Sequence, residues 1–278
     1  MTEPDDALPA IAFIGAGSMG GAILQGVLAS GIPVAGGLRA VNRTEAKAAA
    51  LRALGVLSLA YETEDDATER VLAGAKLVVL GVKPAGIPGL LEEIRPMLDP
   101  DAVVVSIAAG VTTERMEALV PNPVVRTMPN TPATVGRGVT GIAGGARATA
   151  SIIALVARLF ETVGSVLVVP ESQMDALSAI SGSGPAYVFL LVEQLAAAAR
   201  RLGFAEAEAR TLAEGTFVGA GALLAASGED PAELRRRVTS PNGTTERAIA
   251  VLEEADLAGI LERAALAAVA RARELAAG

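Results

Sequence analysis

The chain has 278 residues, of which 51% are hydrophobic and 3% aromatic, and its formal net charge is −8. This length allows one large domain or two ordinary ones, and the acidic balance argues against a nucleic-acid partner, which would select a basic face. The sequence contains no cysteine and no histidine. Disulfides, thiolate nucleophiles and Cys-based zinc sites are therefore excluded, and we expect no metal site.

The N-terminal segment MTEPDDALPA is acidic and lacks the basic region of a secretory signal. The run from Ala7 to Leu38 carries no charge, and hydropathy alone would assign a membrane helix to it. Glycines and prolines punctuate the run, which favours a buried strand, a turn and a buried helix instead. We therefore expect a cytoplasmic protein with no membrane partner.

The first part of the chain alternates between strand-like and helix-like segments. Strands are predicted at residues 10–17, 36–43, 75–84, 102–111, 123–130, 138–145 and 164–171. Helices are predicted at residues 18–30, at 44–54 with Thr44 as the N-cap, at 87–98 and at about 149–162. This alternation predicts an α/β fold with a mostly parallel, doubly wound sheet of the Rossmann type.

After Pro170 the strand patterns stop and helical patterns replace them. Helices are predicted at residues 172–202, 205–227, 244–255 and 257–276, with SGSGP breaking the first. We therefore predict a dinucleotide-binding domain at residues 1–170 and an all-α substrate-binding and dimerisation domain at residues 171–278. The Ala- and Leu-rich stripes of these helices suit either an intramolecular core or a dimer interface. The dimer is favoured because a small helical domain buries its apolar faces better by pairing.

A glycine-rich turn follows the first predicted strand in the segment IAFIGAGSMGGAI. Gly15 would allow a tight turn, Gly17 would let a pyrophosphate approach the backbone, and Gly20 would let helix and strand pack closely. Ser18 and Met19 complete the loop, and the helix that starts there presents oriented N–H groups to phosphate. This spacing is a weak signal alone, but its place after the first strand favours a dinucleotide site over a plain turn.

The second strand ends in Asn42, Arg43 and Thr44. Enzymes that use NAD tend to carry Asp or Glu there to bind the ribose 2′-OH, whereas a cation with amide and hydroxyl donors suits a 2′-phosphate. The segment therefore predicts NADPH as the cofactor, with NADH possible. The alternative is that Arg43 is an ordinary solvated surface residue.

Two further strand ends supply candidate cofactor residues, because ligands bind at the carboxyl edge of such a sheet. The first is GVKP and the second is RTMPNTPA. The alternative for both is ordinary turn chemistry at a strand end. The candidates are Val82, Lys83, Pro84, Met128, Asn130 and Thr131.

Two segments rich in glycine and hydroxyl groups interrupt the helical half, SAISGSGPAYVF at 178–189 and VTSPNGTTERAI at 238–249. Each is expected to end one helix and start another, with Pro185 in a first turn and Asn242 or Thr244 as an N-cap. Helix junctions do not account for so many hydroxyls. A helix N-terminus with free N–H groups suits a small anion such as a carboxylate, and a threonine hydroxyl is a credible donor to a developing amine nitrogen.

These motifs, in this order and spacing, resemble the pyrroline-5-carboxylate reductase family over essentially the whole chain. They are GAGSMG at 15–20, GVKP, RTMPNTPA, SAISGSGPAYVF and VTSPNGTTERAI, and the last two are the family-specific ones. The resemblance implies reduction of the cyclic imine 1-pyrroline-5-carboxylate to L-proline with NAD(P)H, the last step of proline biosynthesis. It also implies a Rossmann domain and a helical domain that interlocks with its twin in a homodimer, possibly within a decamer of dimers.

The resemblance also assigns roles to particular residues. Ser240 and the N–H groups near Gly243 and Thr244 would bind the substrate carboxylate, and Thr245 would contact the ring nitrogen as proton donor or relay. The family usually has glycine where this chain has Asn242, which tolerates left-handed backbone angles better than other non-glycine residues, so we expect the loop to be preserved. The segment that would line the same pocket comprises Ser181, Gly182, Ser183 and Gly184.

Two rival functions fit part of the pattern. A β-hydroxyacid dehydrogenase has the same plan of domains, but that family carries a catalytic lysine on the first interdomain helix, and this chain has no lysine after Lys83. A non-catalytic NADP-sensing protein would keep the glycine turn without needing the hydroxyl-rich segments.

Overall fold

The computed structural model describes residues 7–277, with side chains to residue 274. The chain divides into two compact units, one formed by residues 1–183 with residues 268–278 and the other by residues 184–267. The boundary between the two compact units thus falls between residues 183 and 184, within a helical region, rather than at residue 170. The boundary at residue 170 remains a prediction.

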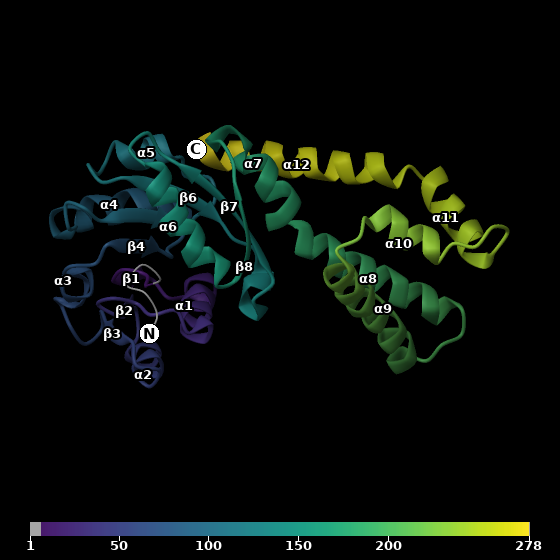
Figure 1. Ribbon diagram of the computed structural model, residues 1–278, viewed down its shortest axis with the longest axis horizontal. Coiled ribbons are helices and arrows are strands. Elements are labelled where there is room, and N and C mark those ends of the chain that lie inside the picture. The colour runs from purple at the N-terminus through teal and green to yellow at the C-terminus, as the bar shows by residue number, and fades with distance from the viewer. Residues whose placement is uncertain (1–6, 278) are drawn as a thin grey trace. The chain divides into compact units, whose positions relative to one another are not determined.

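An eight-stranded sheet forms the centre of the first unit, with the strand order β3-β2-β1-β4-β5-β6-β7-β8 (Figure 1). All neighbouring strands are parallel except β6 and β7. The strands are β1 (Ile11–Ile14), β2 (Leu38–Asn42), β3 (Leu57–Ala60), β4 (Leu77–Leu80), β5 (Val103–Ser106), β6 (Val124–Met128), β7 (Gly138–Gly144) and β8 (Gly164–Val168). The prediction of a mostly parallel, doubly wound sheet is confirmed.

Helices cover both faces of this sheet, as Figure 1 shows. Alternate residues of β1 point to opposite faces: Phe13 packs with α1 and α6, and Ile14 packs with α3 and α4. The uncharged run from Ala7 to Leu38 folds into β1, α1 and the start of β2, as expected. The helices are α1 (Ser18–Ser30), α2 (Glu45–Arg52), α3 (Ala67–Leu72), α4 (Ile87–Ile94), α5 (Thr113–Glu117) and α6 (Ala150–Glu161).

Four short elements have no counterpart in the sequence analysis: β3, α3, α5 and α10 (Pro231–Arg237). Each has seven residues or fewer, which is too short for a clear hydrophobic period. Tertiary packing stabilises the first of them, since β3 pairs with β2 along its length and three of its four residues are buried. Packing of this kind is not visible in local sequence.

The SGSGP segment does not break its helix as predicted. Helical structure runs from Glu171 to Arg201, through α7 (Met174–Leu177), a π-helical turn (Ser178–Gly182) and α8 (Gly184–Arg201). In the turn, Ser183 N–H donates to the Ser178 carbonyl at 2.9 Å, five residues back. The π turn absorbs the glycines and serines without ending the helix. Pro185 lies in the first turn of α8, as predicted.

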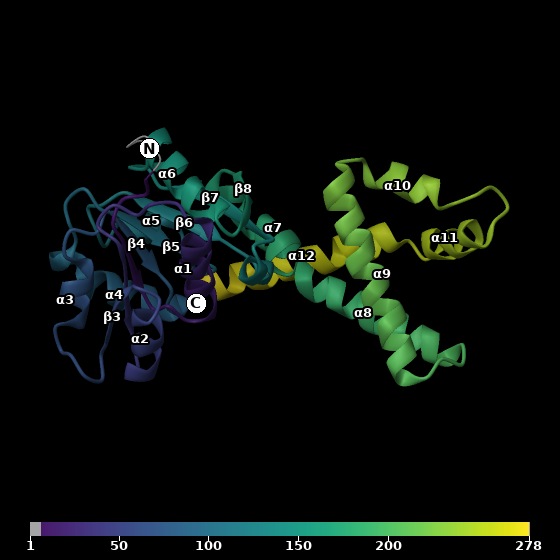
Figure 2. The ribbon, with the colours of Figure 1, turned by 60° about the horizontal axis from the view of Figure 1, so that its bottom comes forward.

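The second unit is helical, with α9 (Glu206–Ser227), α10, α11 (Thr244–Glu254) and most of α12 (Leu257–Ala277) following α8. Figures 1 and 2 show α8 packed against α9. Many large apolar side chains of this unit are exposed, including Phe189 at 62% and Val218 at 72%. By length and composition alone, the described helix Glu171–Arg201 is apolar enough to cross a membrane, and 6% of its most apolar stretch is buried.

Candidate functional site

The glycine turn brings three backbone segments into contact at the carboxyl edge of the sheet. Gly15 has φ +90°, and a Cβ there would lie 3.0 Å from the Gly81 carbonyl oxygen. A Cβ on Gly20 would lie 2.7 Å from the Gly15 oxygen, and one on Gly81 only 2.1 Å from it. Real Cβ atoms do not approach oxygen so closely, so β1, α1 and β4 can pack in this way only through glycines.

Gly17 differs from its neighbours because a Cβ there would meet nothing within 4 Å. It is the N-cap of α1, and no side-chain hydrogen bond caps this helix. The first N–H groups of α1 are therefore accessible to a ligand. Ser18 is exposed beside it, and Met19 is half-buried against the core. A depression of about 390 Å³ opens next to this turn, with Gly17, Ser18, Lys47 and Thr134 in its lining. These features fit a dinucleotide phosphate.

The end of β2 carries the three residues expected at the cofactor ribose. Asn42 is buried and its Nδ2 donates to Ser58 Oγ at 3.2 Å. Arg43 is exposed, and its guanidinium has no hydrogen-bond or ion-pair partner among residues 7–277. Thr44 is the N-cap of α2, as predicted, although its hydroxyl accepts no capping bond. Arg43 and Thr44 are thus free to contact a ligand, whereas the Asn42 side chain faces inward.

Two carboxylates lie at the N-terminus of α2. Glu62 accepts the N–H of Glu45, and Glu45 in turn pairs with Arg52. The hydrogen bond that Arg52 donates to Glu45 raises the pKa of Arg52 above its usual value. Arg52 thus neutralises Glu45, while Glu62 accepts one of the first N–H groups of α2.

The ends of β4 and β6 hold the remaining cofactor candidates. Val82 packs on the core, Lys83 is exposed, and Pro84 begins a 3₁₀ turn, Pro84–Gly86. At the end of β6, Thr131 is exposed. These four residues border the carboxyl edge of the sheet. Their contact with a cofactor stays a prediction.

Asn130, the remaining candidate on this loop, has a side chain whose amide is bonded at both ends within the first unit. It is 7% exposed, its Nδ2 donates to the Ser181 carbonyl at 2.9 Å, and its Oδ1 accepts the Val139 N–H at 2.8 Å. Beside it, a Cβ on Gly182 would lie 3.1 Å from Met128 Cε. Two segments far apart in sequence, RTMPNTPA and the start of SGSGP, therefore meet within the first unit.

Arg126 is a buried residue that the sequence analysis did not single out. Its side chain is 4% exposed and pairs with Glu171 at 2.8 Å and Asp175 at 3.1 Å. These bonds attach the first turns of the long helix to β6. A charge inside the apolar strand PVVRTM is the signal that points to a buried ion pair, because unpaired charge is rarely buried.

The SPNGTT segment lies in the second unit, between α10 and α11. The Gly243 N–H donates to the Ser240 carbonyl at 2.9 Å, and Asn242 has φ 60°. Pro241 followed by a positive φ, closed by this bond, is the signature of a type II turn. Asn242 thus takes the left-handed conformation expected of it. The N-cap of α11 is Gly243, so the prediction of Asn242 or Thr244 as N-cap is wrong.

The start of α11 presents unused donors. Arg247 makes the first helical bond, to Gly243, and the N–H groups of Thr244, Thr245 and Glu246 have no acceptor within the described chain. The hydroxyls of Ser240, Thr244 and Thr245 likewise make no hydrogen bond there. An N-terminus with three free N–H groups and three free hydroxyls can bind a carboxylate and still have a hydroxyl left for proton transfer.

Glu246 holds this loop and was also missed. Its Oε2 accepts the Asn242 N–H at 2.8 Å, so the side chain reaches back over the turn in the manner of a capping box. The signal in the sequence is a glutamate three residues after the N-cap Gly243.

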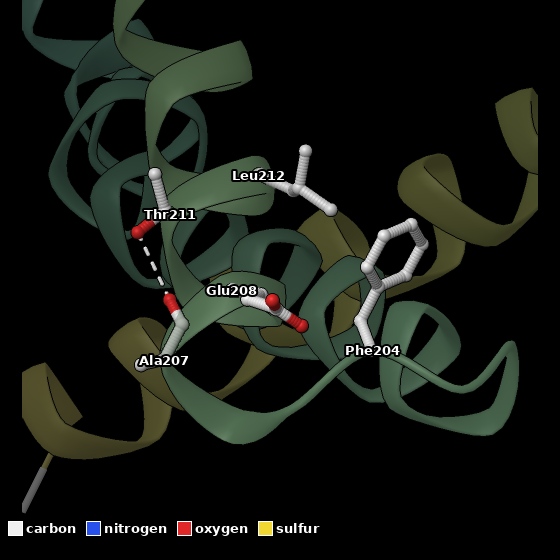
Figure 3. Close-up of a pocket in the computed structure, with 5 residues that line it drawn as sticks. All are labelled: Phe204, Ala207, Glu208, Thr211 and Leu212. Atoms are coloured by element: carbon white, nitrogen blue, oxygen red, sulfur yellow. Dashed lines mark hydrogen bonds between the residues drawn. The ribbon is translucent and has the colours of Figure 1, made fainter.

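A separate pocket of about 430 Å³ lies at the start of α9, lined by Phe204, Ala207, Glu208, Thr211 and Leu212 (Figure 3). The Thr211 hydroxyl donates to the Ala207 carbonyl at 2.9 Å, and Glu208 accepts the Ala205 N–H at 2.9 Å. Its polar groups are therefore already engaged, and it contains none of the predicted site residues.

Comparison with known proteins places the chain among relatives that match it over almost its full length. It is 40% identical over 271 residues to the pyrroline-5-carboxylate reductase of Pseudomonas aeruginosa, covering 96% of this chain and 97% of the relative. It is 41% identical to that of Corynebacterium melassecola, covering 95% and 98%. The chain belongs to the pyrroline-5-carboxylate reductase family. The resemblance inferred from the motifs is confirmed.

Solved structures agree with this family and its fold. The pyrroline-5-carboxylate reductase of Coxiella burnetii matches with a TM-score of 0.87 and 36% identity, covering 95% of this chain and 97% of that one. A Plasmodium falciparum pyrroline carboxylate reductase with NADP bound matches with a TM-score of 0.79 and 25% identity, covering 96% and 98%. The Rossmann-type sheet with a helical second part is therefore the fold of this reductase family.

Two family models match separate parts of the chain. The model described as NADP oxidoreductase, coenzyme F420-dependent, matches residues 10–110, which include the glycine turn and the end of β2. The model for pyrroline-5-carboxylate reductase dimerisation matches residues 171–275. The second range contains both hydroxyl-rich segments and the exposed apolar helices of the second unit.

Proposed function

We propose that this protein reduces 1-pyrroline-5-carboxylate to L-proline with NADPH, the final step of proline biosynthesis. The observation that carries the proposal is the start of α11, where three N–H groups and three hydroxyls lack partners in a chain of the reductase family. They suit a small carboxylate with a basic nitrogen nearby, and a cyclic imino acid has both groups.

In this proposal, residues at the start of α11 bind the substrate and supply a proton to it. Ser240 and the N–H groups of Thr244 and Thr245 hold the substrate carboxylate and so fix the face of the ring that is presented. Bound reduced nicotinamide supplies the hydride for the imine carbon. As the C=N pair moves onto nitrogen, the Thr245 hydroxyl donates or relays the proton that leaves a neutral secondary amine. No histidine is needed, which agrees with its absence.

The cofactor assignment has support from the glycine turn and the end of β2. The open approach at Gly17 fits a pyrophosphate, and the free guanidinium of Arg43 fits a 2′-phosphate. NADPH is thus the proposed cofactor, with NADH as a weaker substitute.

The proposed partner is a second copy of this chain. The exposed apolar side chains of α8, such as Phe189 at 62% and Leu190 at 54%, lie in the segment matched by the dimerisation model. A dimer would cover them, and a decamer of dimers is the larger assembly proposed. The same burial would make a membrane unnecessary for Glu171–Arg201, so we propose a cytoplasmic protein with neither membrane nor nucleic acid as partner.

The test is NADPH consumption by the purified protein with 1-pyrroline-5-carboxylate, with NADH in parallel and proline measured in step. Loss of NADPH matched by proline would support the proposal, and a lower rate with NADH would support the cofactor preference. Binding of NADPH without turnover would favour the sensor instead. Turnover of a β-hydroxy acid but not of the imine would favour the dehydrogenase.

A further inference from the structure

A proline leaves one carbonyl of the long helix without its usual partner. In an α-helix the N–H of residue 185 would donate to the carbonyl of residue 181. Pro185 has no N–H, so it cannot donate to the Ser181 carbonyl. This carbonyl lies in the π turn, Ser178–Gly182, where an unsatisfied carbonyl would weaken an already irregular stretch of helix.

Asn130 supplies the missing donor from a different element. Its Nδ2 lies 2.9 Å from the Ser181 oxygen, while its Oδ1 accepts the Val139 N–H at 2.8 Å. The two partners fix the orientation of the amide, because one is a donor and the other an acceptor. At 7% exposed, the side chain is buried, and both ends of its amide are bonded to protein groups.

The bond holds the π turn beside the loop that follows β6. Within the turn, Ser181 Oγ donates to the Leu177 carbonyl at 3.1 Å and Ser183 N–H to the Ser178 carbonyl at 2.9 Å. Gly182 approaches Met128 so closely that a Cβ would lie 3.1 Å from its Cε. The turn that carries Ser181 is therefore set against the loop after β6 at two points, and Asn130 makes the polar link.

We infer that Asn130 is a positioning residue. It replaces the helix N–H that Pro185 lacks and so fixes the Ser181–Ser183 turn against the loop after β6, without touching the cofactor. The effect on catalysis rests on the proposed function and on the family resemblance, which assigns Ser181, Gly182, Ser183 and Gly184 to the substrate pocket. The effect on the turn itself does not depend on either.

Two substitutions separate positioning from cofactor contact. Asn130→Ala removes both bonds, whereas Asn130→Asp keeps the acceptor for Val139 and loses the donor to Ser181. Both are expected to lower kcat/KM for the imine by about tenfold to a hundredfold, with the Kd for NADPH changed less than about twofold. An equal rise in the Kd for NADPH would overturn the inference and make Asn130 a cofactor contact.

A second-site substitution provides the decisive test. Pro185→Ala returns an N–H that can donate to the Ser181 carbonyl. Asn130→Ala is therefore expected to lower kcat/KM much less in the Pro185→Ala background than in the wild type. This comparison is a double-mutant cycle. Purely additive losses would overturn the inference.

Hydrogen–deuterium exchange gives a readout independent of turnover. Exchange across residues 178–187 is expected to speed up in Asn130→Ala and to slow again in the double variant. Asn122→Ala is the matched control, since Asn122 is also buried and its Nδ2 donates to the Ala102 carbonyl at 2.9 Å. It is expected to lower stability without changing exchange in this turn. If wild type fails to reduce the imine, the proposed function falls, and unchanged exchange in Asn130→Ala would separately refute the positioning role.

Discussion

The two loops proposed to bind ligand, Gly15–Gly20 in the first unit and Ser240–Thr245 in the second, solve the same problem by opposite means. Each presents the N-terminus of a helix to an anion. The first is shaped by the lack of side chains, because Gly15, Gly20 and Gly81 pack backbone against backbone. The second is shaped by side chains, since Pro241 and Asn242 form its turn and Glu246 bonds across it.

This difference determines what each loop tolerates. A Cβ at Gly20 or Gly81 would collide with a backbone oxygen that has no room to move. At position 242 the requirement is a positive φ, which asparagine meets at modest cost. A non-glycine residue is therefore tolerated at position 242 of the second loop, whereas Gly20 and Gly81 have no substitute.

The largest expected effect comes from putting a side chain against the first loop. Gly81→Ala would place a Cβ 2.1 Å from the Gly15 oxygen. Forcing β1 and β4 apart is expected to cost about 1–3 kcal/mol of stability and to weaken NADPH binding at least tenfold, or roughly 1.4 kcal/mol. Thermal unfolding and NADPH titration measure both. Gly89→Ala is the control because a Cβ there meets nothing within 4 Å; similar losses in both variants would contradict the packing argument.

The next effect tests the chemistry of the second loop. Thr245→Val removes a hydroxyl with no internal partner and keeps its shape. We expect a loss of about tenfold to a thousandfold in kcat/KM for the imine, the usual range for a hydrogen bond that also transfers a proton. Steady-state kinetics measure it. Thr216→Val is the control, because that hydroxyl donates to its own helix at 2.7 Å. Unchanged kinetics in Thr245→Val would remove this residue from the mechanism.

Arg43→Ala tests whether Arg43 in the first unit binds the 2′-phosphate of NADPH. Loss of a charge-assisted bond of about 1.5–3 kcal/mol is expected to raise the Kd for NADPH about tenfold or more and the Kd for NADH less than twofold. Direct titration with both dinucleotides measures this. Arg70→Ala serves as control since Arg70 is paired with Glu64. Equal weakening of both cofactors by Arg43→Ala would refute the 2′-phosphate assignment.

The smallest effect concerns the tolerance of the second loop. Asn242→Ala keeps a Cβ at φ 60° without the side-chain hydrogen bonding that favours asparagine there, at a cost of about 1 kcal/mol. KM for the imine is expected to be several-fold higher in Asn242→Ala than in Asn242→Gly. Kinetics of the two variants measured side by side make the comparison. A higher KM in the glycine variant would mean that the asparagine amide itself contacts the substrate.

Local sequence predicted much of the fold because its signals are local. Apolar runs with Gly or Pro at one or both ends marked seven of the strands, and the glycine spacing marked the helix start at Ser18. The elements it missed, such as β3 and α3, are stabilised by neighbours rather than by their own pattern. The π turn was also missed, because SGSGP has the composition of a break, and its bonds within the helix and to Asn130 are not visible in local composition.

The sequence by itself determined the family, the two-part plan and the positions of the glycine and hydroxyl loops, because each depends on residue types at fixed short spacings. Tertiary structure alone decided what Asn130 and Arg126 do. Asn130 donates to a residue 51 positions away, and Arg126 pairs with residues 45 and 49 positions away. Such partners are chosen by how strands and helices pack, and no spacing along the chain encodes which polar group a buried side chain will meet.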